Sequence, residues 1–266
     1  MTSSYDKIKL AHEGAVAVIT LSDPVTLNAL GRPMAEQLGQ ALTEVSQGEQ
    51  AARAIVITGE GRGFCSGADL QAGPAQFDDD GQLDAGALIE TLYNPLVQQI
   101  RDLPIPLVTA VNGAAAGIGC SIALLGDLIV AAESAYFLQA FRRIGLAPDG
   151  GSSYLLPRLI GKARAMEMVL LGERIAAAQA LDWGLINRCA PDADLMSVAL
   201  GLAQTLAEGP ASLGLIRKAI WASLDADWAA QLAHERAAQR SAGRTEDFRE
   251  GVAAFLEKRP ATFKGL

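Results

Sequence analysis

Two glycine-rich loops of the sequence could each present backbone amides to a negatively charged ligand. They cover residues 61–70 (GRGFCSGADL) and 112–121 (NGAAAGIGCS), and each directly follows an apolar run. Amides in such loops are unhindered, and two that converge can hold an oxyanion, each contributing about 3 kcal/mol to barrier lowering. The second loop also opens a predicted helix, whose first amides favour negative charge. Small residues at such turns also serve close packing alone, so neither loop is specific by itself.

Other roles for these loops are excluded by the residues around them. The glycines in 117–119 are not followed by the third glycine of a dinucleotide fingerprint, and no GxxxxGK[ST] phosphate loop occurs. The sequence has two histidines, His12 and His234, and its cysteines show no metal-ligand spacing, so we expect no metal site. Neither histidine is close in sequence to Ser66 or Ser121, which disfavours a serine hydrolase.

The composition is typical of a soluble α/β protein. Half of the 266 residues are hydrophobic and only 5% are aromatic, so the core is built mainly from aliphatic side chains. A formal charge of −8 disfavours a nucleic-acid partner. No N-terminal apolar segment indicates secretion, and polar residues interrupt the apolar stretch 107–132, so no membrane span is predicted. We therefore expect a cytoplasmic protein with reduced thiols at its three cysteines, Cys65, Cys120 and Cys189.

Hydrophobic periodicity places the two loops in an α/β framework. Residues 8–12 and 16–21 form a predicted hairpin, and continuous apolar runs predict buried strands at 54–58, 107–111 and 127–131. Helical spacing predicts helices at 33–45, 87–102, 161–171, 176–183, 192–208, 210–224, 228–240 and 245–257, besides a glycine- and alanine-rich helix after residue 117. The segment 72–86 holds four aspartates and is either a mobile loop or a solvated acidic surface. The order of elements predicts a core at 1–190 and a helical C-terminal region at 191–266.

Short motifs follow one another in a specific order along the chain. They are LNAL at 27–30, FCSGADL at 64–70, VNGAAAGIG at 111–119, GLAPDGG at 145–151, LPRLIG at 156–161, LGERI at 171–175, ALDWGL at 180–185, EDFREGVAAF at 246–255 and KRP at 258–260. In this order they closely resemble the crotonase (enoyl-CoA hydratase/isomerase) family over essentially the whole chain. The resemblance implies an α/β fold, a spiral of ββα units with a helical C-terminal trimerisation region. It also implies a homotrimer or a dimer of trimers.

The resemblance implies an acyl-CoA thioester substrate, with coenzyme A as part of the substrate and no separate cofactor. The thioester oxygen would accept hydrogen bonds from the backbone amides of Ala68 and Ile118. Further substrate contacts carried over from the family fall on Ser66, Gly67, Ala68, Asp69, Leu70, Gly117 and Phe141. Lys264 and Arg32 are candidates for the coenzyme A phosphates, although each alone is also typical of an ordinary surface cation.

The sequence departs from the hydratases of this family at two positions. Those hydratases use two glutamates, and the corresponding residues here are Ser121 and Phe141. Neither can act as the acid or base that adds water across a double bond at neutral pH.

One carboxyl group, that of Asp149 in PDGGS, remains as a candidate base. An aspartate here resembles two branches of the family, the isomerases of phenylacetyl-CoA degradation and the 4-chlorobenzoyl-CoA dehalogenases. The dehalogenases carry tryptophan and histidine where this chain has Phe141 and Arg142, which favours the isomerases. We therefore expect an isomerase with Asp149 as its catalytic residue. The alternatives are a hydratase with an atypical site and a binding protein without turnover. For Asp149 itself, the alternative is a turn residue that caps the helix after it.

Overall fold

The computed structural model describes residues 5–48, 51–70 and 77–266. A six-stranded sheet has the order β1-β2-β3-β5-β7-β10, and β1 and β2 form the predicted hairpin, closed by Gly14 at φ +62°. The other neighbours in this sheet are parallel. Its strands are β1 (Ile8–Glu13), β2 (Val16–Leu21), β3 (Ala54–Gly59), β5 (Leu107–Val111), β7 (Leu128–Ala132) and β10 (Arg188–Ala190). The three predicted buried strands are confirmed, and every residue of β3 and β5 is buried.

A second, four-stranded sheet lies beside the first and has the order β4-β6-β8-β9. Its strands are β4 (Gly63–Cys65), β6 (Ala114–Ala116), β8 (Tyr136–Leu138) and β9 (Ile175–Ala176). Three strands of the first sheet, β3, β5 and β7, are each followed directly by a strand of the second sheet. The chain therefore advances along both sheets in step, and the expected α/β fold with repeated strand–strand–helix order is confirmed.

Helices surround the two sheets and continue beyond them. They are α1 (Arg32–Ser46), α2 (Asn94–Arg101), α3 (Ile118–Leu124), α4 (Ser152–Leu171), α5 (Ala177–Trp183), α6 (Leu195–Ala207), α7 (Ser212–Ser223), α8 (Trp228–Ala242) and α9 (Glu246–Glu257). Short 3-10 turns occur at Pro24–Thr26, Ala140–Ile144 and Asp192–Asp194, and a π-helical turn occurs at Ile89–Tyr93. The predicted start of one helix at residue 161 is wrong, because α4 begins at Ser152 and is interrupted at Gly161 (φ 76°, ψ 160°).

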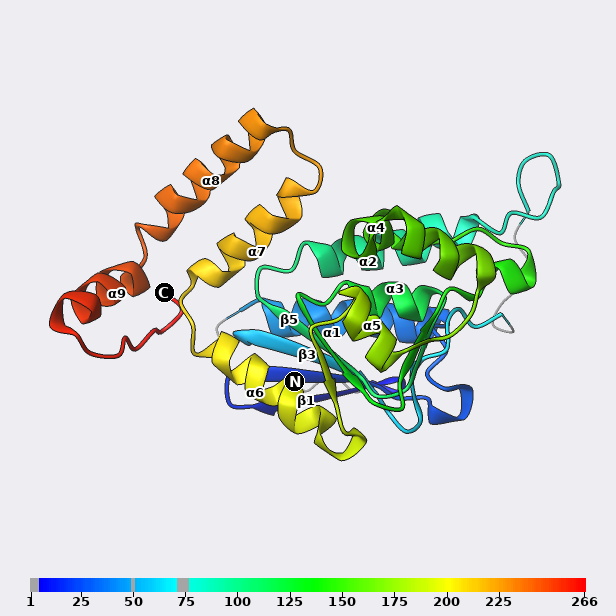
Figure 1. The fold of residues 1–266 in the computed structure, drawn as a ribbon, viewed down its shortest axis with the longest axis horizontal. Coiled ribbons are helices and arrows are strands. Elements are labelled where there is room, and N and C mark those ends of the chain that lie inside the picture. The colour runs from blue at the N-terminus through cyan, green and yellow to red at the C-terminus, as the bar shows by residue number, and fades with distance from the viewer. Residues whose placement is uncertain (1–4, 49–50, 71–76) are drawn as a thin grey trace.

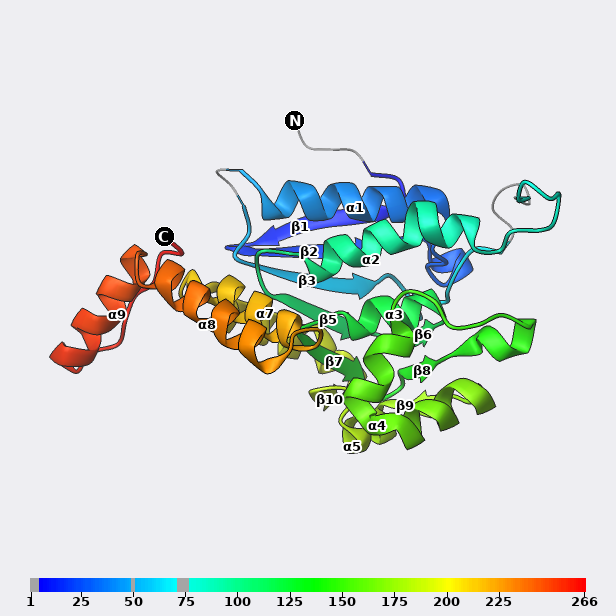
Figure 2. The same cartoon turned by 90° about the horizontal axis from the view of Figure 1, so that it is seen from above.

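The C-terminal helices divide into one that covers the sheet and three that leave it. Helix α6 packs across β2, β3, β5 and β7, whereas α7, α8 and α9 extend away from the sheets as an arm (Figures 1 and 2). Arg217 fixes the base of this arm: its buried guanidinium pairs with Asp127 at 2.7 Å and donates to the carbonyls of Ile100, Arg101 and Leu103. The assignment of residues 191–266 to subunit assembly stays a prediction.

Candidate active site

The first glycine-rich loop leaves β4 and is bonded to residues 26–30. The backbone amide of Ser66 donates to Leu27 O at 3.0 Å, and its hydroxyl donates to Thr26 O at 2.8 Å. One residue further on, Leu30 N donates to Gly67 O at 2.7 Å, and Leu30 forms an isolated parallel bridge with Ala68. The LNAL segment therefore fixes the path of the loop by main-chain contacts.

Two asparagine side chains hold the start of this loop. The carbonyl of Gly63 accepts from Asn28 Nδ2 at 2.8 Å and from Asn112 Nδ2 at 3.2 Å. The buried Asn28 also accepts from the amide of Asp23 at 2.8 Å and has φ +59°, a left-handed conformation that asparagine tolerates better than most residues. Asn112, which begins the second glycine-rich loop, and Asn28 of the LNAL segment therefore both bind the first glycine-rich loop at Gly63.

The second glycine-rich loop places the start of α3 directly against β4. Gly117 has φ +53°, and its amide donates to Leu138 O at 2.9 Å before α3 begins at Ile118. A Cβ atom at Gly119 would lie 2.3 Å from Cys65 O, so only glycine allows this approach.

The two loops meet at the residues that precede the predicted oxyanion donors. A Cβ atom on Gly117 would lie 3.8 Å from Gly67 Cα, and one on Gly67 would lie 3.2 Å from Ala116 O. Ala68 and Ile118 follow these two glycines in sequence. Within the part of the chain that the structure describes, neither of their amides donates a hydrogen bond to the protein. Two unengaged main-chain donors therefore come from adjacent loops, the arrangement that an oxyanion site needs.

Asp149 lies in a loop that packs against the start of α3. Its neighbour Gly150 has φ +58°, and a Cβ atom there would lie 2.2 Å from Ile118 Cδ1 and 2.8 Å from Ser121 Cβ. The Asp149 carbonyl accepts from the hydroxyls of Ser121 at 3.1 Å and Ser152 at 2.9 Å. This pair of hydroxyls joins the Asp149 loop to α3 on one side and to α4 on the other.

The carboxyl group of Asp149 is not used as a helix cap. The N-cap of α4 is Gly151, with no side-chain capping bond, so the interpretation of Asp149 as a capping turn residue is wrong. Its Oδ1 atom is buried and has no hydrogen-bond partner in the structure. Burial raises the pKa of Asp149 from its ordinary value of 3.8 to about 6. A carboxyl group in this environment can exchange a proton near neutral pH.

The remaining predicted site residues occupy different surroundings. Phe141 is buried, and its Cζ atom lies 3.8 Å from the Cβ position of Gly117, so it belongs to the same cluster. Leu70 is 72% exposed at the outer end of the first loop, next to the half-buried Asp69. Lys264 lies in the C-terminal tail, where its backbone amide donates to the carboxylate of Asp247 at 2.7 Å. In Figures 1 and 2 this tail lies beside α9 in the arm, away from α3 and β6.

Two more sequence predictions concern Arg32 and the acidic segment 72–86. Arg32 begins α1, two residues after Leu30, and pairs with Glu36 at 3.3 Å on the surface. Residues 72–76 of the acidic segment lie outside the described residues. Residues 77–84 are mostly exposed, and the carboxylate of Asp78 accepts from the amides of Asp80 at 3.0 Å and Gln82 at 2.8 Å.

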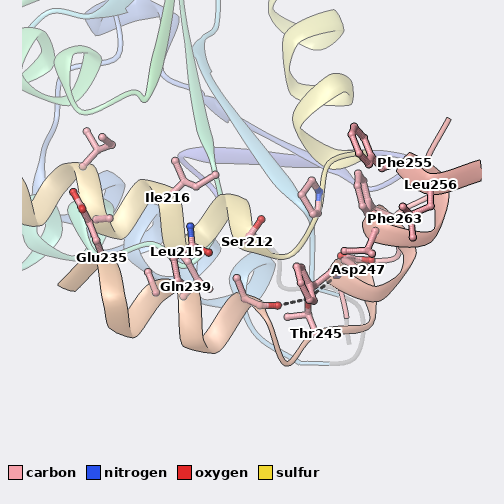
Figure 3. A pocket seen from close by; sticks show the side chains of 18 residues that line it. Ser212, Leu215, Ile216, Glu235, Gln239, Thr245, Asp247, Phe255, Leu256 and Phe263 are labelled. Atoms are coloured by element: carbon pink, nitrogen blue, oxygen red, sulfur yellow. Dashed lines mark hydrogen bonds between the residues drawn. The ribbon is translucent and has the colours of Figure 1, made fainter. Parts of the chain in front are cut away.

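The arm carries a separate apolar groove between α7, α8 and α9. Phe255, Leu256 and Phe263 gather at one end, and Leu215 and Ile216 lie toward the other (Figure 3). Phe255 is 83% exposed, which is unusual for a large apolar side chain.

Residues 5–48, 51–70 and 77–266 contain no group of three or more potential metal ligands and no helix long and apolar enough to span a bilayer.

Comparisons with known proteins identify the family of the chain. A family model described as enoyl-CoA hydratase/isomerase matches residues 11–266. A "probable enoyl-CoA hydratase" of Rhodobacter capsulatus is 46% identical over 98% of this chain and 99% of its own. The 1,2-epoxyphenylacetyl-CoA isomerase of Escherichia coli is 44% identical over 96% and 98% of the two chains. The solved enoyl-CoA hydratase of Bacillus anthracis superimposes with a TM-score of 0.89 at 30% identity, covering 98% of this chain and 100% of that one. The chain therefore belongs to the crotonase, or enoyl-CoA hydratase/isomerase, family.

Proposed function

We propose that this chain is an acyl-CoA isomerase that moves a double bond, or rearranges a ring epoxide, through an enolate. The observation that carries the proposal is Asp149, which is half-buried, has one buried carboxyl oxygen without a partner and precedes Gly150, the residue that packs against Ile118. Burial raises the pKa of this carboxyl group above its ordinary value, whereas hydrogen bonds lower the pKa values of Asp23, Asp225 and Glu250. The relative named as a 1,2-epoxyphenylacetyl-CoA isomerase supports the proposal, while the one named as a hydratase supports the main alternative.

The proposed reaction needs one proton carrier and one oxyanion site. The thioester oxygen of a 3-enoyl-CoA lies between the amides of Ala68 and Ile118. The Asp149 carboxylate removes a proton from C2, and the electron pair moves onto the thioester oxygen as a dienolate. The carboxylic acid of Asp149 then returns the proton to C4, giving the 2-enoyl-CoA and the original carboxylate. The backbone donors stabilise the charge only while it exists, which is the requirement for lowering the barrier.

Hydration is less well supported by the residues around Asp149. Adding water requires one group that activates water and another that protonates the α-carbon. The Ser121 hydroxyl is buried and donates to the Asp149 carbonyl, and Phe141 is apolar. Neither supplies the second titratable group, whereas an isomerase needs only one.

The test is turnover by the wild-type chain and by Asp149→Asn with a 3-enoyl-CoA. The conjugated 2-enoyl thioester absorbs in the ultraviolet, and product analysis separates it from a 3-hydroxyacyl-CoA. A parallel panel includes straight-chain and epoxyphenylacetyl-type thioesters. We expect Asp149→Asn to lower kcat by about 10²- to 10⁴-fold, the usual contribution of a general base. The exposed Asp182→Asn is the matched control, because it makes the same change on α5 outside the site.

The outcomes separate the three candidate functions. A 2-enoyl product that Asp149→Asn abolishes supports the isomerase. A 3-hydroxyacyl product from the wild type identifies a hydratase, and binding of thioesters without any product identifies a binding protein. Wild-type turnover by Asp149→Asn on every substrate would remove Asp149 from the mechanism.

We also propose that the chain assembles as a homotrimer or a dimer of trimers through its arm. The apolar groove of Figure 3 and exposed side chains such as Phe255 and Leu256 (74% exposed) favour burial against another surface. Sedimentation of the wild type and of Phe255→Glu tests this assembly. We expect a trimer or hexamer for the wild type and dissociation for the variant, and a monomeric wild type would contradict the proposal.

A further inference from the structure

Tyr93 is a buried tyrosine close to the reacting loops whose hydroxyl the proposed reaction does not use. It is 2% exposed and ends the π-helical turn that precedes α2. Single π-turns occur often at functional sites, because they displace one side chain from the regular helical position. The Tyr93 hydroxyl donates to the carbonyl of Leu30 at 2.8 Å.

Leu30 links this hydroxyl to the first predicted oxyanion donor. The Leu30 amide donates to Gly67 O at 2.7 Å, and that carbonyl belongs to the same planar peptide unit as the Ala68 amide. In a trans peptide the C=O and N–H groups point in opposite directions. A bond that holds Gly67 O therefore also fixes the direction of Ala68 N–H.

The hydroxyl of Tyr93 is suited to a fixed, protonated role. Burial first, and then the charges of Asp149, Cys65 and Asp69, raise the pKa of Tyr93 to about 12, an effect that Arg32 opposes. The phenol therefore stays protonated, and remains a hydrogen-bond donor, at neutral pH.

We propose that Tyr93 is a positioning residue for the oxyanion site. Its hydroxyl holds the Leu30 carbonyl, Leu30 holds the Gly67 carbonyl, and the Ala68 amide is thereby aimed at the thioester oxygen. The Leu30 carbonyl is buried, and removing the Tyr93 hydroxyl takes this hydrogen-bond donor away from it. Residues 26–30 then shift, and the direction of the Ala68 N–H group changes with them. This inference deepens the proposed function and rests on it for the identity of the thioester oxygen.

The first test compares Tyr93→Phe with Tyr154→Phe, which also removes a tyrosine hydroxyl bond. Tyr154 donates to Asp225, in the loop between α7 and α8, at 2.6 Å, and this hydrogen bond is exposed. With a 3-enoyl-CoA we expect Tyr93→Phe to lower kcat about 10-fold and to change KM less than about 2-fold. A misaligned donor reduces the stabilisation of the transition state more than it reduces the binding of the substrate. Tyr154→Phe should keep both constants. Unchanged kcat in Tyr93→Phe would overturn the proposal.

The second test reads the oxyanion site without any reaction. An unreactive aromatic acyl-CoA with a ¹³C-labelled thioester carbonyl is bound, and its C=O stretching frequency is measured by infrared difference spectroscopy. Two aligned amides polarise the carbonyl and lower this frequency in the wild type. We expect a smaller lowering in Tyr93→Phe, the full effect in Tyr154→Phe and the full effect in Asp149→Asn, which keeps both amides. A full frequency shift in Tyr93→Phe would contradict the positioning role even if kcat falls.

A conservative variant and the wild type separate the remaining explanations. Fluorotyrosine placed at position 93 keeps the hydroxyl, and we expect it to restore both kcat and the frequency shift. Failure to restore the frequency shift would refute the role of the hydroxyl, even if Tyr93→Phe folds poorly. If the wild type lowers the carbonyl frequency but forms no product, the isomerase assignment fails while Tyr93 is still tested by the spectrum.

Discussion

Replacing Asp149 with asparagine is expected to stabilise the folded chain at neutral and alkaline pH. Folding raises the pKa of this carboxyl from 3.8 to about 6, so the folded state binds its proton more tightly than the unfolded state. The resulting loss of stability is absent below pH 3.8, grows as pH rises and is complete above about pH 6. Each tenfold change in proton affinity corresponds to about 1.4 kcal/mol, and partial solvent access reduces the total to about 1–2 kcal/mol. The neutral amide of Asp149→Asn avoids this cost at every pH.

The assay is urea unfolding of the wild type and Asp149→Asn at pH 5 and pH 8. We expect the stability advantage of the variant to be larger at pH 8 than at pH 5 by about 1 kcal/mol. Asp247→Asn is a control of opposite sign. Burial alone would raise the pKa of Asp247, but backbone amides of Ala211, Lys264 and Gly265 donate to its carboxylate and lower the pKa. That variant should lose stability by a similar amount at pH 5 and pH 8, because a lowered pKa changes stability only as pH falls towards and below 3.8. An Asp149→Asn variant that is less stable than the wild type at pH 8 would refute the reasoning.

The pH dependence of turnover and two further substitutions probe the same contacts. For the wild type, kcat/KM should rise with pH through about 6, because Asp149 must be ionised to remove a proton, and a pH–rate profile checks this. Gly150→Ala should lower kcat at least about 100-fold, because its Cβ would lie 2.2 Å from Ile118 Cδ1 at a position with φ +58°. Steady-state kinetics with circular dichroism as a folding control would show it. Arg217→Met should destabilise the chain by about 3–5 kcal/mol in urea unfolding, because Asp127 and three carbonyls lose a buried cation.

The main sheet could be predicted from the sequence, whereas the second sheet could not. Strands β3 and β5 are apolar runs bounded by glycine, asparagine or proline, and such runs are typical of strands buried on both faces. Strand β6 is three alanines, and β4 is Gly-Phe-Cys, neither of which has a strand pattern long enough to recognise. They pair only because the first sheet brings the glycine-rich loops together. The sequence prediction starts helix α4 too late because Pro157 and Gly161 normally end helices.

The donors of the candidate site were predictable as motifs, and their surroundings were not. The resemblance located Ala68 and Ile118, but nothing local to either loop predicts that Gly67 and Gly117 come into contact. The sequence also left two interpretations of Asp149 open; the unpartnered Oδ1 atom and the Gly151 N-cap speak against the capping interpretation, and the catalytic role stays a proposal. Tyr93 was missed because it lies 63 positions from Leu30 along the chain, and a single tyrosine in an apolar segment is ordinarily a core residue.

The proposed use of main-chain groups to bind the thioester oxygen separates two kinds of evolutionary constraint in this chain. Peptide nitrogens do not titrate, oxidise or change with the side chain, so mutation at Ala68 or Ile118 leaves the hydrogen-bond donor itself in place. Ser121 and Phe141 contact Gly150 and Gly117 through their side chains, and Asp149 precedes Gly150, so these three side chains can be exchanged one at a time. After duplication of such a gene, substitutions at these three positions can produce an enzyme with a new reaction that still binds coenzyme A esters.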